Sequence, residues 1–256
     1  PSPGNVDEGV SYDPERGRRV PTVNIFDMRE VYKRTYSYLK SLEPKGVIFL
    51  HGADMAALPY VDIFTQGESW NRTRERAYRD LTPDFYRTIV NRTQYGVPFT
   101  FYSFHQYSWR GGRYHEPTPA REVIMMGMQH RNHFNLADNT GVVPSARIWA
   151  FTEPFWAQAE YVPDWDARSP ASADREGLLC ATYLERGEGK ATIFVSNWNY
   201  EEVSGSITLD FGKLGFRPTE AVLMDPLGEQ RRSLSSPERV ELTLPARDLR
   251  AIKLKK

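Results

Sequence analysis

The chain has 256 residues, with 33 basic and 33 acidic side chains, so its formal net charge is zero. This balance holds on both sides of residue 166 and argues against nucleic-acid binding and against a polybasic membrane patch. A single cysteine, Cys180, excludes an internal disulfide framework, and the apolar runs are too short for a helix that spans a bilayer.

Residues 1–165 alternate helical patterns with short apolar runs, and this alternation predicts an α/β fold. The order of the elements suits the C-terminal half of a (β/α)8 TIM-type barrel. The predicted elements are a helix over 27–42, strands over 46–51 and 61–67, a helix from Thr82 to Gly96, a strand over 97–104, a helix over 118–134, a short strand over 148–151 and a short helix over 154–159.

Residues 166–256 follow a different pattern, with short alternating strands separated by turn residues. This pattern predicts an antiparallel β-sandwich as a second domain. The predicted strands are 178–185, 191–198, 204–211, 220–224, 229–234, 240–244 and 249–254, and a hairpin turn over 186–190 joins the first two.

Candidate catalytic groups follow the predicted strands of the first part, because barrel enzymes carry their chemistry at the C-terminal ends of the strands. Glycosidic bond cleavage usually needs two carboxyl groups, and Glu68 and Asp62 are the candidates for them. The sequence does not distinguish which of the two is the acid. Imidazole, indole, phenol and carboxylate groups of the same rim are candidates for sugar binding: His51, Asp54, Trp70, His105, Tyr107, Trp109 and Glu153.

Each of these candidates also has a structural interpretation. Asp62 points either into the site or into a buried hydrogen bond, and His51 could equally be a structural histidine. His130 and His133 could together ligate a metal, but a surface or capping role is the stronger interpretation, since no third ligand is close in sequence. No dinucleotide, phosphate-loop or nucleophile-elbow motif is present, so the sequence predicts neither a cofactor nor a metal. Cys180 and the group Met125, Met126 and Met128 are expected to pack in the core.

Several segments, taken in order, carry a family resemblance: 25–34, 46–51, 60–68, 94–98, 161–165, 191–198, 214–216 and 244–248. Over nearly its whole length the chain resembles the C-terminal part of large bacterial proteins related to glycoside hydrolase family 123. The resemblance implies a multidomain glycosidase with an N-terminal sandwich, a barrel and a C-terminal sandwich. The chain departs from it at His51-Gly52-Ala53, where relatives tend to have His-Thr-Ser. That family uses an adjacent Asp-Glu pair, and the register of Asp7-Glu8 does not match it.

About four parallel strands cannot close an eight-stranded barrel, and an open parallel sheet would leave exposed edges. We therefore expect a preceding segment or a partner chain to complete the barrel. The leading hypothesis is a glycoside hydrolase, or its C-terminal portion, that acts on a complex polysaccharide or glycan. The alternatives are a non-catalytic carbohydrate-binding protein or a structural subunit on a degenerate barrel. A secreted or periplasmic location would suit a polysaccharide substrate.

Overall fold

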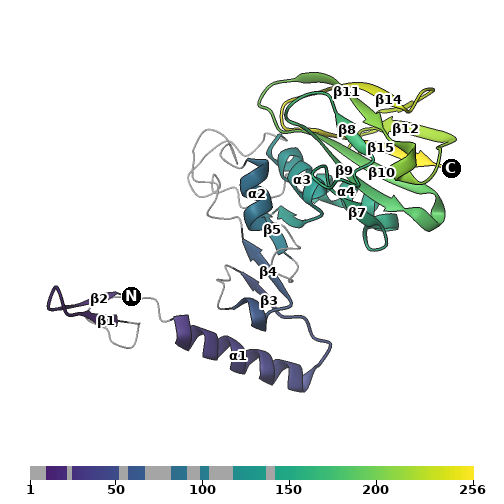
Figure 1. Cartoon of the computed structure of the whole chain (residues 1–256). Helices are drawn as coiled ribbons and strands as arrows, with labels where there is room; N and C mark the ends of the chain where they lie inside the picture. Colours follow the sequence, from purple (N-terminus) through teal and green to yellow (C-terminus); the bar gives the residue numbers. More distant parts are fainter. Residues whose placement is uncertain are drawn as a thin grey trace. The chain divides into compact units, whose positions relative to one another are not determined.

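The computed structural model describes residues 10–21, 25–51, 57–66, 82–90, 99–103, 118–136 and 142–256, and Figure 1 shows their elements. The chain divides into two compact units, one formed by residues 1–66 and 95–98 and the other by residues 67–94 and 99–256. The predicted domain boundary at residue 166 stays a prediction, because the second unit contains residues on both sides of it. In the described ranges, no helix is long and apolar enough to cross a membrane.

The first unit contains a helix, an antiparallel hairpin and a pair of parallel strands. Its elements are β1 (Val10–Asp13), β2 (Arg18–Pro21), α1 (Ile25–Leu42), β3 (Phe49–His51) and β4 (Ile63–Gln66). The parallel pairing sets Phe49 beside Ile63 and His51 beside Thr65. The helix predicted over 27–42 is confirmed, whereas both predicted strands are shorter than expected and the hairpin was not predicted.

The second unit begins with α2 (Pro83–Val90), β5 (Phe99–Ser103), α3 (Thr118–His130), β6 (His133–Leu136) and α4 (Val142–Trp156). Strands β5 and β6 pair in parallel, with Ser103 beside Leu136. The helix predicted to reach residue 134 ends earlier, because Arg131 takes a left-handed backbone conformation with φ of 52° and β6 starts directly after it. Residues other than glycine rarely adopt this left-handed conformation, and it cannot continue a right-handed α-helix.

The strand predicted over 148–151 is wrong, since these residues lie inside α4, and the separate helix over 154–159 is wrong for the same reason. Ile148, Trp149, Ala150 and Phe151 form a short apolar run, and such a run cannot distinguish a buried strand from a buried helix segment. The helix ends two residues after Pro154, which has no backbone N–H to donate to the preceding turn.

Two antiparallel sheets make up the rest of the second unit. They contain the seven strands predicted for this part of the chain and two short strands that were not predicted, while the β-sandwich as a separate domain stays a prediction. The six-stranded sheet has the order β13-β12-β15-β10-β9-β7, and the three-stranded sheet has the order β14-β11-β8. The strands are β7 (Glu160–Val162), β8 (Ala171–Ala173), β9 (Leu178–Glu185), β10 (Lys190–Asn197), β11 (Val203–Leu209), β12 (Glu220–Met224), β13 (Arg231–Ser233), β14 (Arg239–Leu244) and β15 (Leu249–Lys255).

Alternating side chains of both sheets form one hydrophobic core. In β14, for example, Val240, Leu242 and Leu244 are buried and the residues between them are exposed. Cys180 is part of this core, as predicted, and burial raises the pKa of its thiol well above the usual range. A buried thiol of this kind is unreactive, because the thiolate is the nucleophile.

The opposite face of the six-stranded sheet is partly covered by α3 and α4, which lie beside β7, β9 and β10 in Figure 1. Tyr183 of β9 stacks on Trp156 with ring centroids 5.4 Å apart and meets Phe155 edge to face at 5.6 Å. Three methionines of α3 are fully buried, as the sequence predicts: Met125, Met126 and Met128.

Candidate functional site

The C-terminal ends of β3 and β4 lie side by side in the first unit, because parallel pairing aligns strand ends. His51, the last residue of β3, is exposed and sits beside Thr65, which is buried near the end of β4. The predicted site residue Asp54 follows β3 along the chain, and Glu68 and Trp70 follow β4. All three lie outside the described residues. The structure therefore describes the ends of β3 and β4 but not the three residues that follow them.

A second pair of parallel strand ends occurs in the second unit, where Ser103 of β5 lies beside Leu136 of β6. Three predicted sugar-binding residues, His105, Tyr107 and Trp109, follow β5 along the chain and lie outside the described residues. The same is true of Asp7 and Glu8 near the start of the chain.

Asp62 lies just before β4, at the N-terminal end of the strand, which is opposite to the end that follows Gln66. Its carboxylate forms an ion pair with Lys40 of α1, with Nζ and Oδ2 2.8 Å apart, and accepts a hydrogen bond from the backbone N–H of Ile48 at 2.7 Å. The backbone N–H of Asp62 in turn donates to the carbonyl of Ile48 at 2.9 Å. Asp62 thus joins α1 to both parallel strands, a structural role that the sequence left open as the alternative.

The electrostatics of Asp62 fit this anchoring role. The hydrogen bond from Lys40 and then that from the Ile48 backbone hold the pKa of the Asp62 carboxyl below its usual range. Lys40 also donates to the carbonyl of Gly46 at 2.5 Å, and its ammonium lies 5.4 Å from the ring centre of Tyr36. A general acid must carry a proton at the working pH. A carboxylate that a neighbouring ammonium keeps ionised is therefore a poor general acid.

Glu153 does not flank a strand, because the predicted strand before it is part of α4. Its side chain is exposed on that helix. In the sequence, Glu153 therefore does not follow the C-terminal end of a strand. Its role in sugar binding stays a prediction.

His130, one of the two histidines considered as metal ligands, lies among aromatic side chains. His130 is fully buried in the last turn of α3, where its ring centre lies 4.6 Å from that of Tyr86, 5.5 Å from that of Trp198 and 5.7 Å from that of Trp165. Its Nδ1 lies 3.0 Å from the carbonyl oxygen of Met126. The surface role expected for His130 is therefore wrong, and within the described residues no group of three potential metal ligands occurs.

Burial explains the electrostatic state of His130. Desolvation lowers the pKa of its imidazole to about 3, and the nearby charge of Arg87 acts in the same direction, whereas the Met126 carbonyl opposes the shift. His130 is therefore neutral at ordinary pH and acts as a core residue.

The sequence did not predict a polar network that joins α2 and α3 to the six-stranded sheet. Arg87 of α2 donates to both carboxylate oxygens of Asp164, at 3.2 and 3.0 Å, and its guanidinium lies 4.2 Å from the ring centre of Trp165. Gln129 donates to Asp164 at 3.0 Å and accepts a hydrogen bond from Ser196 at 2.9 Å. Burial raises the pKa of Asp164, and the charge of Arg87 opposes that shift. In the sequence, the adjacent residues Asp164 and Trp165 at the end of the first predicted domain were the sign of this network.

The chain matches no protein-family model and no curated protein sequence. Solved structures do match it. A GH27 β-L-arabinopyranosidase from Geobacillus stearothermophilus aligns with 89% of this chain and 54% of its own, at a TM-score of 0.59 and 11% identity. The α-galactosidase I from Mortierella vinacea aligns with 91% and 64%, at a TM-score of 0.56 and 10% identity.

A noncanonic maltogenic α-amylase from Thermotoga neapolitana aligns with 89% of this chain and 59% of its own, at a TM-score of 0.53 and 11% identity. These proteins are TIM-barrel glycoside hydrolases, and at such low identity the likeness concerns the fold. The chain spans between about half and two thirds of the length of these three structures. The relation to family 123 stays a prediction.

Proposed function

We propose that this chain is part of a glycoside hydrolase that cleaves glycosidic bonds in a complex polysaccharide or glycan. The observation that carries the proposal is the likeness of the fold, over about nine tenths of the chain, to TIM-barrel glycoside hydrolases. In that fold, catalytic groups follow the C-terminal ends of the strands. Glu68, Asp54 and His105 occupy such positions along this chain.

Within this proposal, Glu68 supplies one catalytic carboxyl group. Asp54 follows the neighbouring parallel strand β3, and we assign it the second carboxyl group. His51, at the end of β3, is exposed and suited to bind a sugar hydroxyl. The aromatic residues Trp70, Tyr107 and Trp109 would stack on sugar rings. Asp62 is not needed for the chemistry, because its carboxylate already holds Lys40 and the Ile48 backbone.

We also propose that the chain corresponds to the later half of the barrel followed by a β-sandwich. Two parallel strand pairs followed by two antiparallel sheets with one shared core support this assignment. Further barrel strands, from the same polypeptide or from a partner chain, would complete the working unit, in agreement with the greater length of the matching structures.

The test is a glycan hydrolysis screen on the complete gene product, with the 256-residue chain as the comparison. Once a substrate is found, Glu68→Gln should lower kcat by at least ~100-fold without a change in melting temperature, because one carboxyl group of the reaction is lost. Asp62→Asn should keep kcat and lower the melting temperature, because it weakens the anchor between α1 and the strands.

The reverse pattern, with kcat lost in Asp62→Asn and kept in Glu68→Gln, would contradict the assignment of roles. A complete protein that binds glycans but hydrolyses none would favour the non-catalytic carbohydrate-binding protein.

A further inference from the structure

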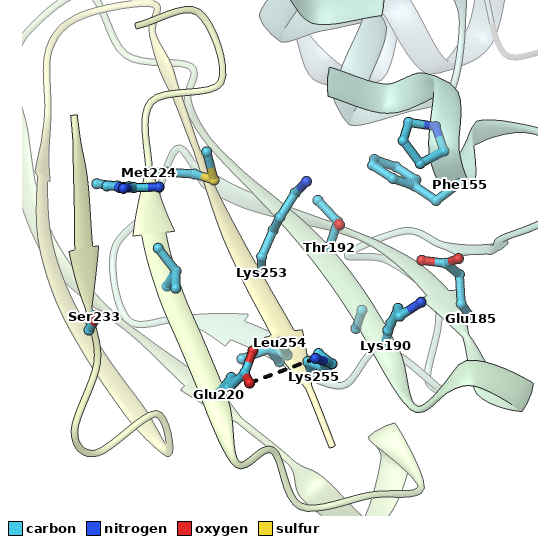
Figure 2. A pocket seen from close by; sticks show the side chains of 14 residues that line it. Phe155, Glu185, Lys190, Thr192, Glu220, Met224, Ser233, Lys253, Leu254 and Lys255 are labelled. Carbon is cyan, nitrogen blue, oxygen red and sulfur yellow. Dashed lines mark ion pairs between the residues drawn. The ribbon is translucent and has the colours of Figure 1, made fainter. Parts of the chain in front are cut away.

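A groove of about 740 Å³ lies on the helix-bearing face of the six-stranded sheet, over the part of that face that α3 and α4 leave uncovered. Strands β10, β12, β13 and β15 form its floor, and Pro154 and Phe155 at the end of α4 form one wall. Figure 2 shows Lys253 and Thr192 rising from the floor toward the helix that carries Phe155. All of the lining residues belong to the second unit.

Basic side chains outnumber acidic ones in this groove. Lys190, Lys253, Lys255 and Arg231 line it, against the two carboxylates of Glu185 and Glu220. The strand register sets Lys190 directly opposite Lys255, with Glu185 opposite Lys190 and Glu220 opposite Lys255 on the outer sides. These four charges balance, so the excess positive charge of the groove lies at Lys253 and Arg231.

The ion pairs that Lys190 and Lys255 form are weak. Lys255 lies 3.7 Å from Glu220, and Lys190 lies 3.3 Å from Glu188. In both pairs the two side chains are largely exposed, and exposed ion pairs contribute little because water and salt screen them.

Lys253 of β15 lies between Thr192 of β10 and Val222 of β12 and is half-buried. Its ammonium lies 4.0 Å from the ring centre of Phe151, and within the described part of the chain no carboxylate forms an ion pair with it. Burial lowers the pKa of Lys253, and the charge of Glu185 opposes that effect. A half-buried ammonium without a carboxylate partner is a position where a ligand carboxylate gains a charge-assisted hydrogen bond.

The remaining lining suits a sugar ring better than a bare anion. Val222 and Met224 give an apolar floor, and Phe155 adds an aromatic wall. The hydroxyl groups of Thr192 and Ser233 lie on the same face as Lys253 (Figure 2). A few polar groups that converge on an apolar concavity are typical of small-ligand sites.

We propose that this groove binds a uronic-acid unit of a glycan, with the sugar carboxylate at Lys253 and the ring against Val222 and Met224. The choice of a glycan rests on the proposed function, whereas the choice of a carboxylated sugar rests on the charges in the groove. The site lies on the six-stranded sheet and uses none of the residues assigned to hydrolysis. It would therefore hold the polysaccharide while the barrel cleaves it.

The experiment measures binding, not cleavage, by titration calorimetry of the 256-residue chain with oligogalacturonate. The comparison ligand is the same oligosaccharide with its carboxylates reduced to hydroxymethyl groups, and galacturonate monomer and sulfate serve as further probes. Oligogalacturonate should bind at least ~10-fold more tightly than the neutral form, because a charge-assisted hydrogen bond is lost in the latter.

Three variants locate the site. Lys253→Met keeps the aliphatic stem and should weaken binding by ~10-fold or more, whereas Lys253→Arg should restore most of it. Lys213→Met removes a lysine from α5 (Phe211–Leu214), outside the groove, and should change nothing. Equal melting temperatures of Lys253→Arg and the original chain would show that the fold is intact.

The proposal is overturned if oligogalacturonate does not bind, if the neutral form binds equally well, or if Lys213→Met weakens binding as much as Lys253→Met. Sulfate binding as tight as that of oligogalacturonate would identify a general anion site and would also overturn it. A complete protein that hydrolyses no glycan would overturn the proposed function and leave the binding of oligogalacturonate unchanged, so the two proposals fail independently.

Discussion

His130 shows how strongly surroundings decide the role of one residue. A pair of histidines three positions apart on a helix is compatible with a metal site, with capping or with packing. The rings of Tyr86, Trp165 and Trp198 around His130 make it a core residue. All three rings come from residues more than thirty positions away in the sequence, so no local pattern could indicate the burial.

The lowered pKa of His130 predicts a specific dependence of stability on pH. The unfolded chain binds a proton at His130 below about pH 6.5, whereas the folded chain does so only near pH 3. Between these values the unfolded state holds more protons, so stability is lost as the pH falls, by at most about 1.4 kcal/mol per pH unit.

Urea unfolding of the original chain and of His130→Phe at pH 7, 6 and 5 measures this effect. The phenyl ring fills the same aromatic surroundings and cannot titrate, so the loss of stability toward pH 5 should become smaller. His51→Phe changes an exposed histidine and serves as the control, which should retain the full dependence. Identical pH dependence in His130→Phe and the original chain would contradict the burial of a neutral imidazole.

Arg247, between β14 and β15, and Glu122 of α3 form a buried ion pair. The Nε and Oε1 atoms are 2.6 Å apart, and the side chains are only 5% and 8% exposed. Arg247 also donates to the carbonyl of Trp198 at 3.0 Å and lies over the rings of Trp198 and Tyr200. Burial raises the pKa of Glu122, and the charge of Arg247 opposes that shift.

We predict that Arg247→Met lowers the free energy of unfolding by about 3–5 kcal/mol, because it leaves a buried carboxyl group without its partner. The double variant Arg247→Met, Glu122→Leu should recover much of that loss, since neither charge then remains buried. Denaturant unfolding at pH 7 compares the four proteins of this cycle. Additive effects of the two substitutions would show that the pair is not coupled.

At the scale of elements, α3 is the helix that joins β6 of the parallel strand pair to β9 and β10 of the six-stranded sheet. Gly127 lies near its end, where a Cβ atom would be 2.5 Å from Cδ1 of Phe134. Phe134 belongs to β6 and stacks on Trp149 of α4, with ring centroids 4.8 Å apart. The glycine therefore allows β6 to turn back closely onto the helix that precedes it.

Gly127→Ala should lower the melting temperature, although alanine favours a helix interior by about 1 kcal/mol over glycine. The reason is that the aromatic stack has no room to move, and overpacking of a core costs about 1–3 kcal/mol. Gly187→Ala, in a hairpin turn where a Cβ would meet nothing within 4 Å, is the matched control and should be nearly neutral. A melting temperature that rises in Gly127→Ala would contradict the close packing of β6.

Strands with one buried face were predicted from their alternation, whereas β9 and β10 are buried on both faces and form nearly continuous buried runs. In β14 that alternation is complete. Helix α4 and strand β6 were not predicted, for two physical reasons. Within the apolar run of α4, Ile148 is buried but Ala150 is exposed, so the run does not mark one buried face. The chain reversal at Arg131 uses a left-handed backbone conformation that an arginine in the sequence does not indicate.

At the scale of the whole molecule, the sequence indicated the C-terminal ends of β3, β4 and β5 closely but could not show which acidic residue is already engaged. Asp62 and Glu68 both flank β4, one at each end. Only the structure reveals that Asp62 meets Lys40, a residue more than twenty positions away on α1. The partner of an acidic residue depends on tertiary packing, whereas its distance from a strand end can be counted.

The outer face of α1 is a further feature that belongs to the whole molecule. Val31, Tyr38 and Leu42 lie on one face of the helix and are 55%, 64% and 65% exposed. Tyr36 and Lys40 lie on the opposite face, toward Tyr60 and Asp62. An apolar stripe opposite the packed face is unfavourable in water and supports the proposal that further barrel elements or a partner chain cover it.

We therefore predict that the 256-residue chain self-associates through this stripe and that Val31→Glu, Leu42→Glu reduces the association without lowering the melting temperature. Ser37→Glu, Ser41→Glu adds the same charge to exposed positions of α1 outside the stripe and is the control. Sedimentation velocity measures the association at several protein concentrations. In the complete protein the stripe would be covered, so there the Val31, Leu42 variant should lower the melting temperature and the serine variant should not. Equal effects of the two variants in both proteins would show that charge, and not the apolar stripe, controls the association.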